Sequence, residues 1–561
     1  MAQVYAISEP LTYDENGVAK ITLKDLVDEG IASKNIIDPM CGKPFSQDET
    51  YIEVTDINGN LEYNVVAITG CNADLPPFIN DINISSTHKA ITINVDATNG
   101  GGAITKYYYS IDNGTNYIES IESSFTINDL TGDTSYNIKV KVEDSKSKIT
   151  EANTLKYSTK DYYVPSIEAT TIHLTEDNKL DNGLIPIYYD EAINSWVVAD
   201  KLDEWYDYEQ KKWANAISVT ESSRSAYISG KELVEDDVLA YFVYIPRYSY
   251  TLFNVESAVI DPLSIPITFV DVNTKTAQAV LDNPQNGDEY VHPAFTFGTD
   301  ELEGIWVGKF ELTPLSQDYE INDPNVMPTV KPGISSLRNQ NVATFFTTIQ
   351  KFNDSNTYGI NNNADVHMIK NTEWGAMAYL SHSIYGVNTK VRINNNSNYI
   401  TGCGAAVEPI LGSDEYITSN ACEIEYNSSF EQLQSTTGNI YGIYDTSGAG
   451  FDYVMGIFKK IIALSGLETV FFEDSSNEKY YNNYYSEGNG LTLENHIIGT
   501  ADMEARNWYG TYSAYLKDTH PYYVRGGYNK WGRHSNIFTP GYARGQNSTS
   551  YSSRAIIPQF R

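Results

Sequence analysis

The residues best suited to molecular recognition are concentrated in the last part of the chain. Between 506 and 561, tryptophan, tyrosine, arginine and histidine alternate with asparagine, serine and glycine. Aromatic rings supply a large, rigid contact area, and the polar residues supply adaptable hydrogen bonds, so this composition is typical of binding surfaces. We expect ligand contact from Trp508, Tyr512, Tyr528, Trp531, Arg533, His534, Tyr542, Arg544 and Tyr551. The alternative is that these aromatic residues fill a core with few regular elements.

Charge separates this segment from the rest of the protein. The chain of 561 residues has 38 Lys and Arg against 73 Asp and Glu, a formal net charge of −35. The segment 506–561 has six arginines and two lysines against one aspartate, which gives it a net charge of +7. The overall acidity argues against nucleic acid and against an anionic membrane as partners, because both need clustered basic residues. The local positive charge favours anionic cell-wall polymers or acidic glycans as ligands.

The four cysteines form two pairs that are each local in the sequence. Cys41 is followed by Cys71, and Cys403 by Cys422, with no CxxC spacing that would indicate zinc or redox chemistry. In an oxidising medium each pair is expected to form a disulfide, and the alternative is four free thiols. We predict no metal and no cofactor.

Strongly apolar strands and amphipathic helices must position the recognition segment. The segments 238–250 and 304–312 are apolar enough to be buried strands. Apolar residues recur at helical spacing in 341–352 and in 370–386, where Asn371 or Thr372 is expected to cap the helix and Glu373 to favour its positive end. This order predicts an α+β domain over 238–561.

Four motifs in this domain resemble the formylglycine-generating-enzyme family, whose fold is C-type-lectin-like. NTEWGAMAY at 371–379 is similar to the family's PTEAEWEYAAR helix, and GNIYGIYDTSGAGFDY at 438–453 to its NxxGLYDMxGNVWEW segment. RGG at 525–527 resembles the late RGGSW, and Ser553-Arg554 the final GFR. The resemblance implies structural roles for Trp374, Tyr453, Arg525, Gly526 and Arg554.

Departures from the family pattern decide what function the resemblance implies. The true enzymes have a C-terminal copper-binding cysteine pair, and here no cysteine follows Cys422. The histidine triad and helical domain of the related sulfoxide synthases are also missing. The chain therefore resembles the non-catalytic relatives, which are phage tropism determinants and variable lectin-like proteins, and we predict that it is not an enzyme.

Three smaller modules are predicted before this domain. Residues 1–75 weakly resemble the globular tail of pilin-like proteins, an α+β attachment module. Residues 76–159 resemble a fibronectin type III β-sandwich, with Tyr136 as its corner tyrosine. In 160–237, the pattern Tyr-Asp-x5-Trp occurs twice, ending at Trp196 and at Trp213, and predicts a linker of two aromatic hairpins. Such aromatic residues either stack on sugars or build a small core.

These features together predict a multidomain, mainly β protein with a C-terminal C-type-lectin-like domain. The favoured function is a phage tail, fibre or head-decoration adhesin that binds a bacterial surface glycan or protein through 238–561. The N-terminal module would attach to other virion proteins, and a homo-oligomer, favoured as a trimer, would add avidity. The chain starts without an apolar signal sequence and has no membrane-spanning run, so assembly in the host and a virion, extracellular location are expected. The alternatives are a bacterial cell-surface or pilus adhesin and, less favoured, a formylglycine-generating oxidoreductase.

Overall fold

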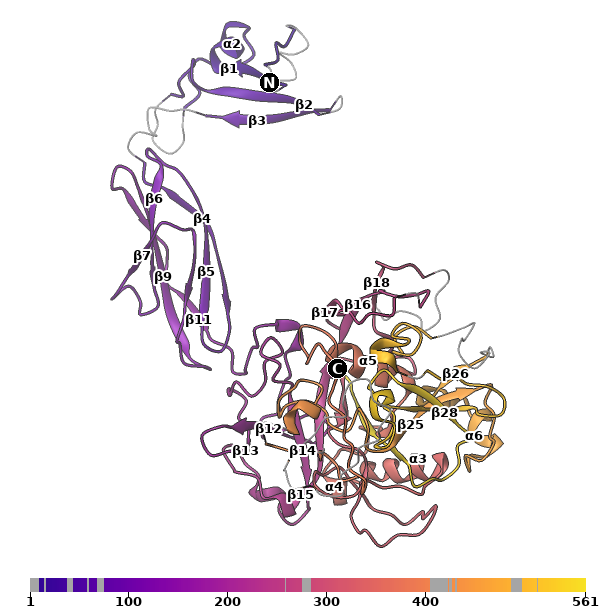
Figure 1. Ribbon diagram of the computed structural model, residues 1–561. Coiled ribbons are helices and arrows are strands. Elements are labelled where there is room, and N and C mark those ends of the chain that lie inside the picture. Colours follow the sequence, from indigo (N-terminus) through magenta and orange to yellow (C-terminus); the bar gives the residue numbers. More distant parts are fainter. Residues whose placement is uncertain are drawn as a thin grey trace. The chain divides into compact units, whose positions relative to one another are not determined.

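The computed structural model divides the chain into two compact units, Met1–Tyr162 and Tyr163–Arg561. The residues that it describes are 10–14, 17–37, 44–57, 60–67, 75–257, 259–274, 284–403, 422, 426–428, 431–485, 497–511 and 513–561. Figure 1 shows the elements of both units in chain order. Within the described residues, no helix combines the length and the apolar character needed to cross a membrane.

Unit 1 begins with a small α+β module. Its strands β1 (Val18–Thr22), β2 (Tyr51–Ile57) and β3 (Asn60–Val66) form one antiparallel sheet in the order β1-β2-β3. Helix α2 (Leu23–Asp28) follows β1 directly and is closed by a capping box between Thr22 and Asp25. The described part of the module therefore contains one helix and one three-stranded sheet. The second predicted cysteine pair, Cys41 and Cys71, lies outside the described residues.

The second part of unit 1 is a sandwich of two antiparallel sheets. One sheet has the order β4-β5-β8, and the other has the order β10-β9-β6-β7 with β11 also paired to β9. The strands are β4 (Phe78–Ser86), β5 (Ile91–Thr98), β6 (Ile104–Ser110), β7 (Ile118–Ser120), β8 (Ser124–Ile127), β9 (Ser135–Asp144), β10 (Ile149–Glu151) and β11 (Leu155–Ser158). Alternate residues of β9 are buried, as expected for strands with one face on a core.

The start of β9 has the tyrosine corner expected of a fibronectin type III-like sandwich. The hydroxyl of Tyr136 accepts a hydrogen bond from the backbone N–H of Thr131 at 3.1 Å. Leu130, next to this turn, packs against the core that Ile138 and Val140 help to form. The hydrogen bond and the apolar contact fix the loop before β9 to the sandwich.

A seven-stranded sheet dominates unit 2, in the order β13-β12-β14-β15-β21-β30-β24. Its strands are β12 (Ile185–Asp190), β13 (Ser195–Val198), β14 (Asn215–Val219), β15 (Val238–Pro246), β21 (Gly304–Gly308), β24 (His367–Met368) and β30 (Ala555–Gln559). All nine residues of β15 are buried, because strands cover both its edges and side chains cover both its faces.

The prediction of a separate linker module over 160–237 is wrong. Strand β14 pairs along its length with β15, and the hairpin of β12 and β13 continues the same sheet. The repeated tryptophans Trp196 and Trp213 are 4% and 0% exposed, so they belong to the core of unit 2 and not to an exposed sugar-stacking face. The aromatic hairpins look separate in sequence only because their pairing partner, β15, comes later.

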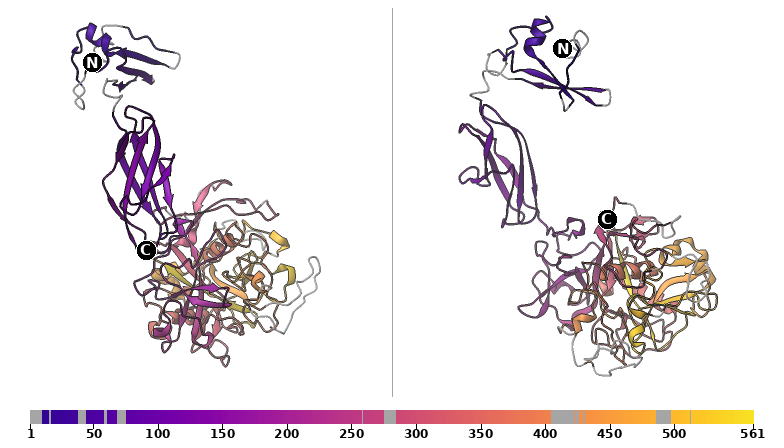
Figure 2. Two further views of the ribbon diagram at one scale, coloured as in Figure 1. Left: turned by 90° about the vertical axis from the view of Figure 1, so that its left-hand side faces the viewer. Right: turned by 45° about the horizontal axis from the view of Figure 1, so that its top comes forward.

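A second sheet of unit 2 has the order β26-β25-β27-β28, with β29 also paired to β25. Its strands are β25 (Phe451–Phe458), β26 (Asn482–Tyr484), β27 (Tyr522–Arg525), β28 (Pro540–Ala543) and β29 (Tyr551–Ser553). Strands β12 to β15 lie at one side of the unit and β25 to β28 at the other (Figures 1 and 2). The helices are α3 (Val342–Gln350), α4 (Ser355–Tyr358), α5 (Asn371–Ser381) and α6 (Thr469–Glu473).

Shorter elements complete unit 2. A three-stranded sheet has the order β17-β16-β18, with β16 (Tyr248–Thr251), β17 (Ile267–Phe269) and β18 (Glu289–Val291). Two small hairpins are formed by β19 (Thr296–Phe297) with β20 (Asp300–Glu301) and by β22 (Thr313–Pro314) with β23 (Pro328–Thr329). A 3₁₀ helix, η7, spans Ser475–Tyr480.

Candidate functional site

Helix α5 and strand β27 meet at the buried centre of unit 2. The guanidinium of Arg525 is fully buried and donates to Asn371 Oδ1 at 2.9 Å and to the carbonyl oxygens of Thr500 and Ala501 at 2.8 and 2.7 Å. Trp374 Nε1 donates to the carbonyl of Ile537 at 2.7 Å. Two of the sequence motifs are therefore joined directly by a hydrogen bond.

Gly526 follows Arg525 at a point where no larger residue fits well. Its φ is +82°, and a Cβ built there would lie 3.1 Å from the carbonyl oxygen of Thr446 and 3.3 Å from the Trp374 ring. The left-handed backbone and the close approach both favour glycine. This position joins three of the motifs at one point.

The start of α5 differs in detail from the sequence prediction. Lys370 is the N-cap residue, so Asn371 and Thr372 lie inside the first turn. Glu373 Oε2 accepts from the backbone N–H of Lys370 at 2.7 Å, and its Oε1 lies 3.0 Å from His367 Nε2. The ammonium of Lys370 and the ring of His367, together with these hydrogen bonds, hold the pKa of the buried Glu373 at about 2 despite its burial.

The fourth motif contributes a buried ion pair. Arg554 donates to the carbonyl oxygens of Gly308 and Tyr444 at 2.8 and 3.0 Å and lies 3.2 Å from Asp452 Oδ2. Glu311 is also fully buried nearby, and its Oε1 accepts from the N–H of Gly450 at 2.8 Å. Tyr453, the next residue on β25, is fully buried as well. The residues to which the resemblance assigns structural roles therefore lie in the interior of unit 2.

Trp508 is one of the nine residues predicted to contact a ligand, and the structure contradicts that prediction. Its side chain is 0% exposed, because the rings of Phe253, His382 and Phe538 surround it at centroid distances of 5.1 to 5.4 Å. Its indole N–H donates to the carbonyl of Val259 at 3.2 Å. Trp508 is a core residue and cannot contact a receptor.

Three of the predicted residues come together in an aromatic cluster at the edge of the second sheet. Tyr528, Trp531 and Tyr551 are half-buried, and their rings surround Phe451 at 5.3, 4.8 and 6.0 Å. Each keeps part of its ring in contact with solvent. Half-buried rings on a fixed support are well suited to binding, because little side-chain entropy remains to be lost.

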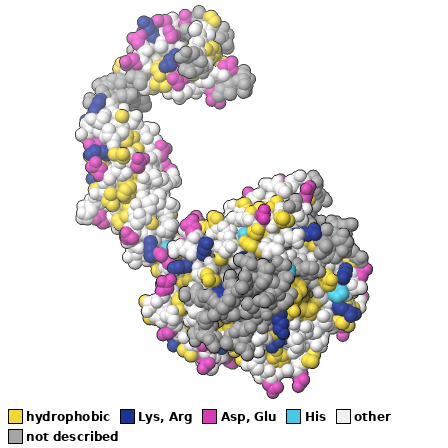
Figure 3. All heavy atoms as spheres, viewed as in Figure 1, with side chains coloured by type: hydrophobic (Ala, Val, Ile, Leu, Met, Phe, Trp, Pro, Cys, Tyr) yellow, Lys and Arg dark blue, Asp and Glu magenta, His cyan; other side chains and the backbone are white. Residues whose placement is uncertain are grey.

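Two other predicted residues, Tyr542 on β28 and Arg544 just after it, belong to a basic cluster. The Lys517 ammonium lies 4.5 Å above the Tyr542 ring and donates to its hydroxyl at 3.3 Å, and the His520 ring lies 4.7 Å away on the same tyrosine. Burial, with the positive charges of Lys517 and Arg544, lowers the pKa of His520. Figure 3 shows lysine, arginine and histidine side chains gathered over this part of the unit.

The remaining predicted residues add little to these clusters. His534 is half-buried on a short 3₁₀ turn, and its backbone carbonyl accepts from Thr539 Oγ1 at 2.6 Å. Tyr512 and the side chain of Arg533 lie outside what the structure describes. Lys517 and His520 were not predicted from the sequence, because only the turn that pairs them with each other brings them to Tyr542.

The predicted bridge between Cys403 and Cys422 is present. The two Cα atoms are 5.6 Å apart and the sulfur atoms are bonded. Cys403 is fully buried, and its sulfur accepts from Asn396 Nδ2 at 3.5 Å. The disulfide therefore joins Cys422 to the buried Cys403.

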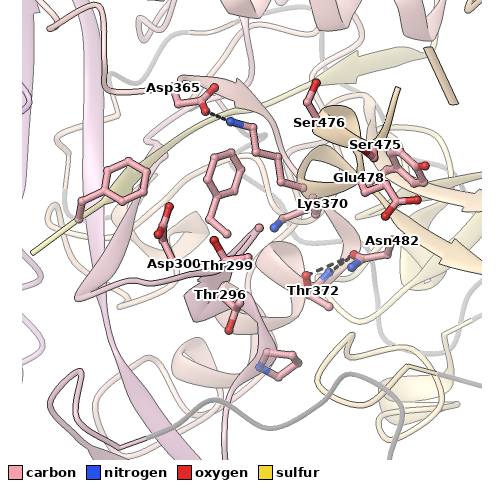
Figure 4. Close-up of a pocket in the computed structure, with 16 residues that line it drawn as sticks. Thr296, Thr299, Asp300, Asp365, Lys370, Thr372, Ser475, Ser476, Glu478 and Asn482 are labelled. Carbon is pink, nitrogen blue, oxygen red and sulfur yellow. Dashed lines mark hydrogen bonds and ion pairs between the residues drawn. The ribbon is translucent and has the colours of Figure 1, made fainter. Parts of the chain in front are cut away.

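A separate polar pocket of about 640 Å³ lies between the β19–β20 hairpin, the start of α5, η7 and β26. Figure 4 shows Thr296, Thr299 and Asp300 on one side of it, Ser475, Glu478 and Asn482 on the other, and Lys370 between them. Among the described residues, no group of three or more His, Cys, Asp or Glu side chains could hold a metal ion.

Comparisons with known proteins give no family for the chain. No family model matches it, and no curated protein matches it. Solved structures match parts of it, including the fn3 domain of human collagen alpha-1(XX), 17% identical over 15% of this chain and 85% of that chain, with a TM-score of 0.13. The PKD1 domain of Vibrio anguillarum Epp is 15% identical over 15% of this chain and 95% of that chain, also with a TM-score of 0.13. Such low scores carry no argument, so the sandwich assignment rests on strand pairing and on Tyr136.

Proposed function

We propose that the chain is a non-enzymatic receptor-binding protein of a phage virion, a tail, fibre or head-decoration adhesin. In this proposal, unit 2 is a C-type-lectin-like head that binds a glycan on the bacterial surface. The observation that carries the proposal is the pair of clusters on its C-terminal segment, one aromatic around Phe451 and one basic around Tyr542. Together they offer stacking faces and unpaired positive charge.

The interior of unit 2 supports the lectin-like assignment. The residues that resemble the formylglycine-generating-enzyme motifs contact one another, as the Arg525–Asn371 hydrogen bond and the Gly526–Trp374 approach illustrate. The late strand β30 pairs with the early strand β21 on one side and with β24 on the other, so the end of the domain lies between two strands that precede it in the chain.

The basic cluster supports an anionic receptor. The guanidinium of Arg544 is exposed and has no hydrogen bond or ion pair within the described part of the chain. The Lys517 ammonium likewise lies over the Tyr542 ring without a carboxylate partner among the described residues. On a protein with a net charge of −35, unpaired cations beside aromatic rings favour an acidic glycan or a cell-wall polymer.

Attachment to cells tests this proposal. Binding of the labelled full chain to a panel of bacterial strains and to immobilised acidic glycans would be measured for the double variant Trp531→Phe/Arg544→Ala. We expect at least about tenfold weaker attachment, because a few aromatic and arginine anchors carry most of the binding energy. Tyr485→Ala, which removes a 66% exposed tyrosine outside both clusters, is the matched control. Unchanged attachment with an intact fold would place the receptor surface elsewhere.

A further inference from the structure

The pocket between β19–β20, α5, η7 and β26 is built from fixed polar groups. The Lys370 side chain is 5% exposed, and its ammonium lies 3.3 Å from Glu373 and 5.2 Å from the centre of the Phe297 ring. The Lys479 ammonium pairs with Asp365 and lies 4.9 Å from the same ring. Asp365 also accepts from the Tyr480 hydroxyl at 2.6 Å. Each lysine is thus held by its own carboxylate against one shared aromatic face.

Other polar groups of this pocket remain available to a ligand. Asn482 Oδ1 accepts from Thr372 N at 2.9 Å and from Thr372 Oγ1 at 3.2 Å, while its Nδ2 donor has no partner within the described residues (Figure 4). The carboxylate of Asp300 and the hydroxyls of Thr296 and Thr299 are likewise without side-chain partners among the residues described. Six hydroxyl side chains line the pocket in all, and each hydroxyl can both donate and accept a hydrogen bond.

The charges of the pocket select the class of ligand. An anion would meet Asp300, which has no counter-ion among the described residues, and Glu478, which pairs with Lys460. Lys370 and Lys479 are already paired with Glu373 and Asp365. A metal ion would find no set of ligands, because no group of three or more His, Cys, Asp or Glu side chains among the described residues could hold one. An apolar molecule would leave the hydroxyls and the Asn482 amide unpaired. A neutral polyol fits, because each of its hydroxyls can both donate and accept. The volume lies within the range of about 300 to 1,000 Å³ usual for small-molecule sites.

We propose that this pocket is a second binding site of unit 2, separate from the aromatic and basic clusters, and that it takes the neutral end of a saccharide chain. Asp300 and Asn482 accept from and donate to adjacent sugar hydroxyls, and Lys370 donates from the floor of the pocket. None of these residues belongs to the surface proposed for the receptor.

Direct binding of simple sugars tests the proposal. The probes are the methyl glycosides of glucose, galactose, rhamnose and N-acetylglucosamine, observed by saturation-transfer NMR on the full chain and titrated where a signal appears. The informative variant is Asp300→Ala/Asn482→Asp. The aspartate at 482 keeps the acceptor for Thr372 N and so preserves the start of α5, but it removes the free donor.

We expect at least one glycoside to bind the unaltered chain and its affinity to fall by about tenfold or more in the double variant, the effect of two lost hydrogen bonds. Trp531→Phe/Arg544→Ala should leave glycoside binding unchanged while weakening attachment to cells. The experiment therefore distinguishes failure of the pocket proposal from failure of the receptor-surface proposal. Absence of any glycoside signal, or equal affinity of the double variant with an unchanged melting temperature, would overturn the second site. A double variant that fails to melt cooperatively would be replaced by Thr299→Val, which removes an exposed hydroxyl that has no side-chain partner among the described residues and should still weaken binding.

Discussion

Buried carboxyl groups make the interior of unit 2 sensitive to pH. Burial, with the charges of Asp452 and Asp445 nearby, raises the pKa of Glu311 well above its ordinary range. Burial also raises the pKa of Asp452 to about 6 in spite of Arg554. An unfolded aspartate titrates at about 3.9. The folded state therefore binds more protons than the unfolded state between about pH 4 and pH 6, and the free energy of unfolding falls as the pH rises through that window.

We predict that unit 2 loses about 1 to 3 kcal/mol of stability between pH 4.5 and pH 7 through these groups, and that Glu311→Gln reduces the loss. Urea unfolding followed by tryptophan fluorescence at several pH values measures it. The lowered pKa of Glu373, about 2, has the opposite sign but acts only below about pH 4.3, where its stabilisation is lost as the pH falls. Burial also lowers the pKa of His292 to about 3 and lowers that of His382, which has the opposite effect on stability over the same interval. The test is therefore the difference between the two proteins, and an identical pH dependence of the unaltered chain and Glu311→Gln would contradict the prediction.

The guanidinium of Arg525 cannot be replaced by another cation. Its two terminal nitrogens serve three acceptors, one side-chain amide and two carbonyls. We predict that Arg525→Lys lowers the free energy of unfolding of unit 2 by about 2 to 4 kcal/mol, because a single ammonium leaves buried acceptors unpaired. Arg544→Lys, at an exposed position, should change it by less than about 0.5 kcal/mol. Equal effects of the two substitutions in urea unfolding would show that the three bonds are not needed.

The structural role of a single residue could be predicted from the sequence where that residue belongs to a motif. Trp374, Arg525 and Arg554 were predicted as structural and lie in the core, because each belongs to a pattern with glycines and aromatic residues at set distances. Trp508 was misassigned, since the rings that bury it come from 253, 382 and 538 and no local pattern announces them. The polar pocket could not be predicted for the same reason, because four distant segments form it.

At the scale of elements, the predicted strands and helices are present, but the predicted domain boundary at 237 lies inside unit 2. Apolar runs indicated β15, β21, α3 and α5, since periodicity is a local property. The pairing of β14 with β15 is not local, so the hairpins of 160–237 looked like an independent module. Within a single segment, an independent aromatic hairpin and the strands of a larger buried sheet have the same composition. Only the pairing partner distinguishes them, and here that partner lies elsewhere in the chain.

The sheet order leads to a prediction about fragments. We expect residues 163–561 to fold alone with a cooperative unfolding transition, and residues 238–561 to be insoluble or to lack one. The shorter fragment loses β12 to β14, which leaves the edge of β15 unpaired and removes Trp205 and Trp213 from the core. Expression yield and near-ultraviolet circular dichroism of both fragments measure this. A cooperative 238–561 fragment would restore the boundary at 237.

The tyrosine corner of unit 1 leads to another prediction. Tyr136→Phe removes the acceptor for Thr131 N and leaves the ring in place, so it should destabilise the sandwich by about 1 kcal/mol. Hydrogen exchange of peptides from β9, followed by mass spectrometry on the full chain, measures the change locally. Tyr157→Phe, on the adjacent strand β11, is the control, since its hydroxyl makes no hydrogen bond among the described residues and should alter exchange little. Faster exchange in both variants alike would contradict a special role for the corner.

At the scale of the whole molecule, the two units carry different spectroscopic reporters. All seven tryptophans lie between 196 and 531, inside unit 2, and unit 1 has none. We predict that urea unfolding followed by tryptophan fluorescence and by far-ultraviolet circular dichroism gives transitions that do not coincide, because the second signal includes the β-sandwich of unit 1. Coincident curves at every pH would show that the units unfold together.

The position of β30 inside the large sheet has a consequence for synthesis on the ribosome. Gln559 accepts from the indole of Trp306, and 253 residues separate these two partners in the chain. During synthesis, the edges of β21 and β24 that pair with β30 therefore have no partner strand until residues 555–559 have been translated. Unit 1 has no such wait and can fold as soon as it leaves the exit tunnel. In a nascent chain that stalls before 555, the β-sandwich of unit 1 would be folded, but the large sheet of unit 2 would have unpaired strand edges. Chaperones and proteases bind such exposed edges.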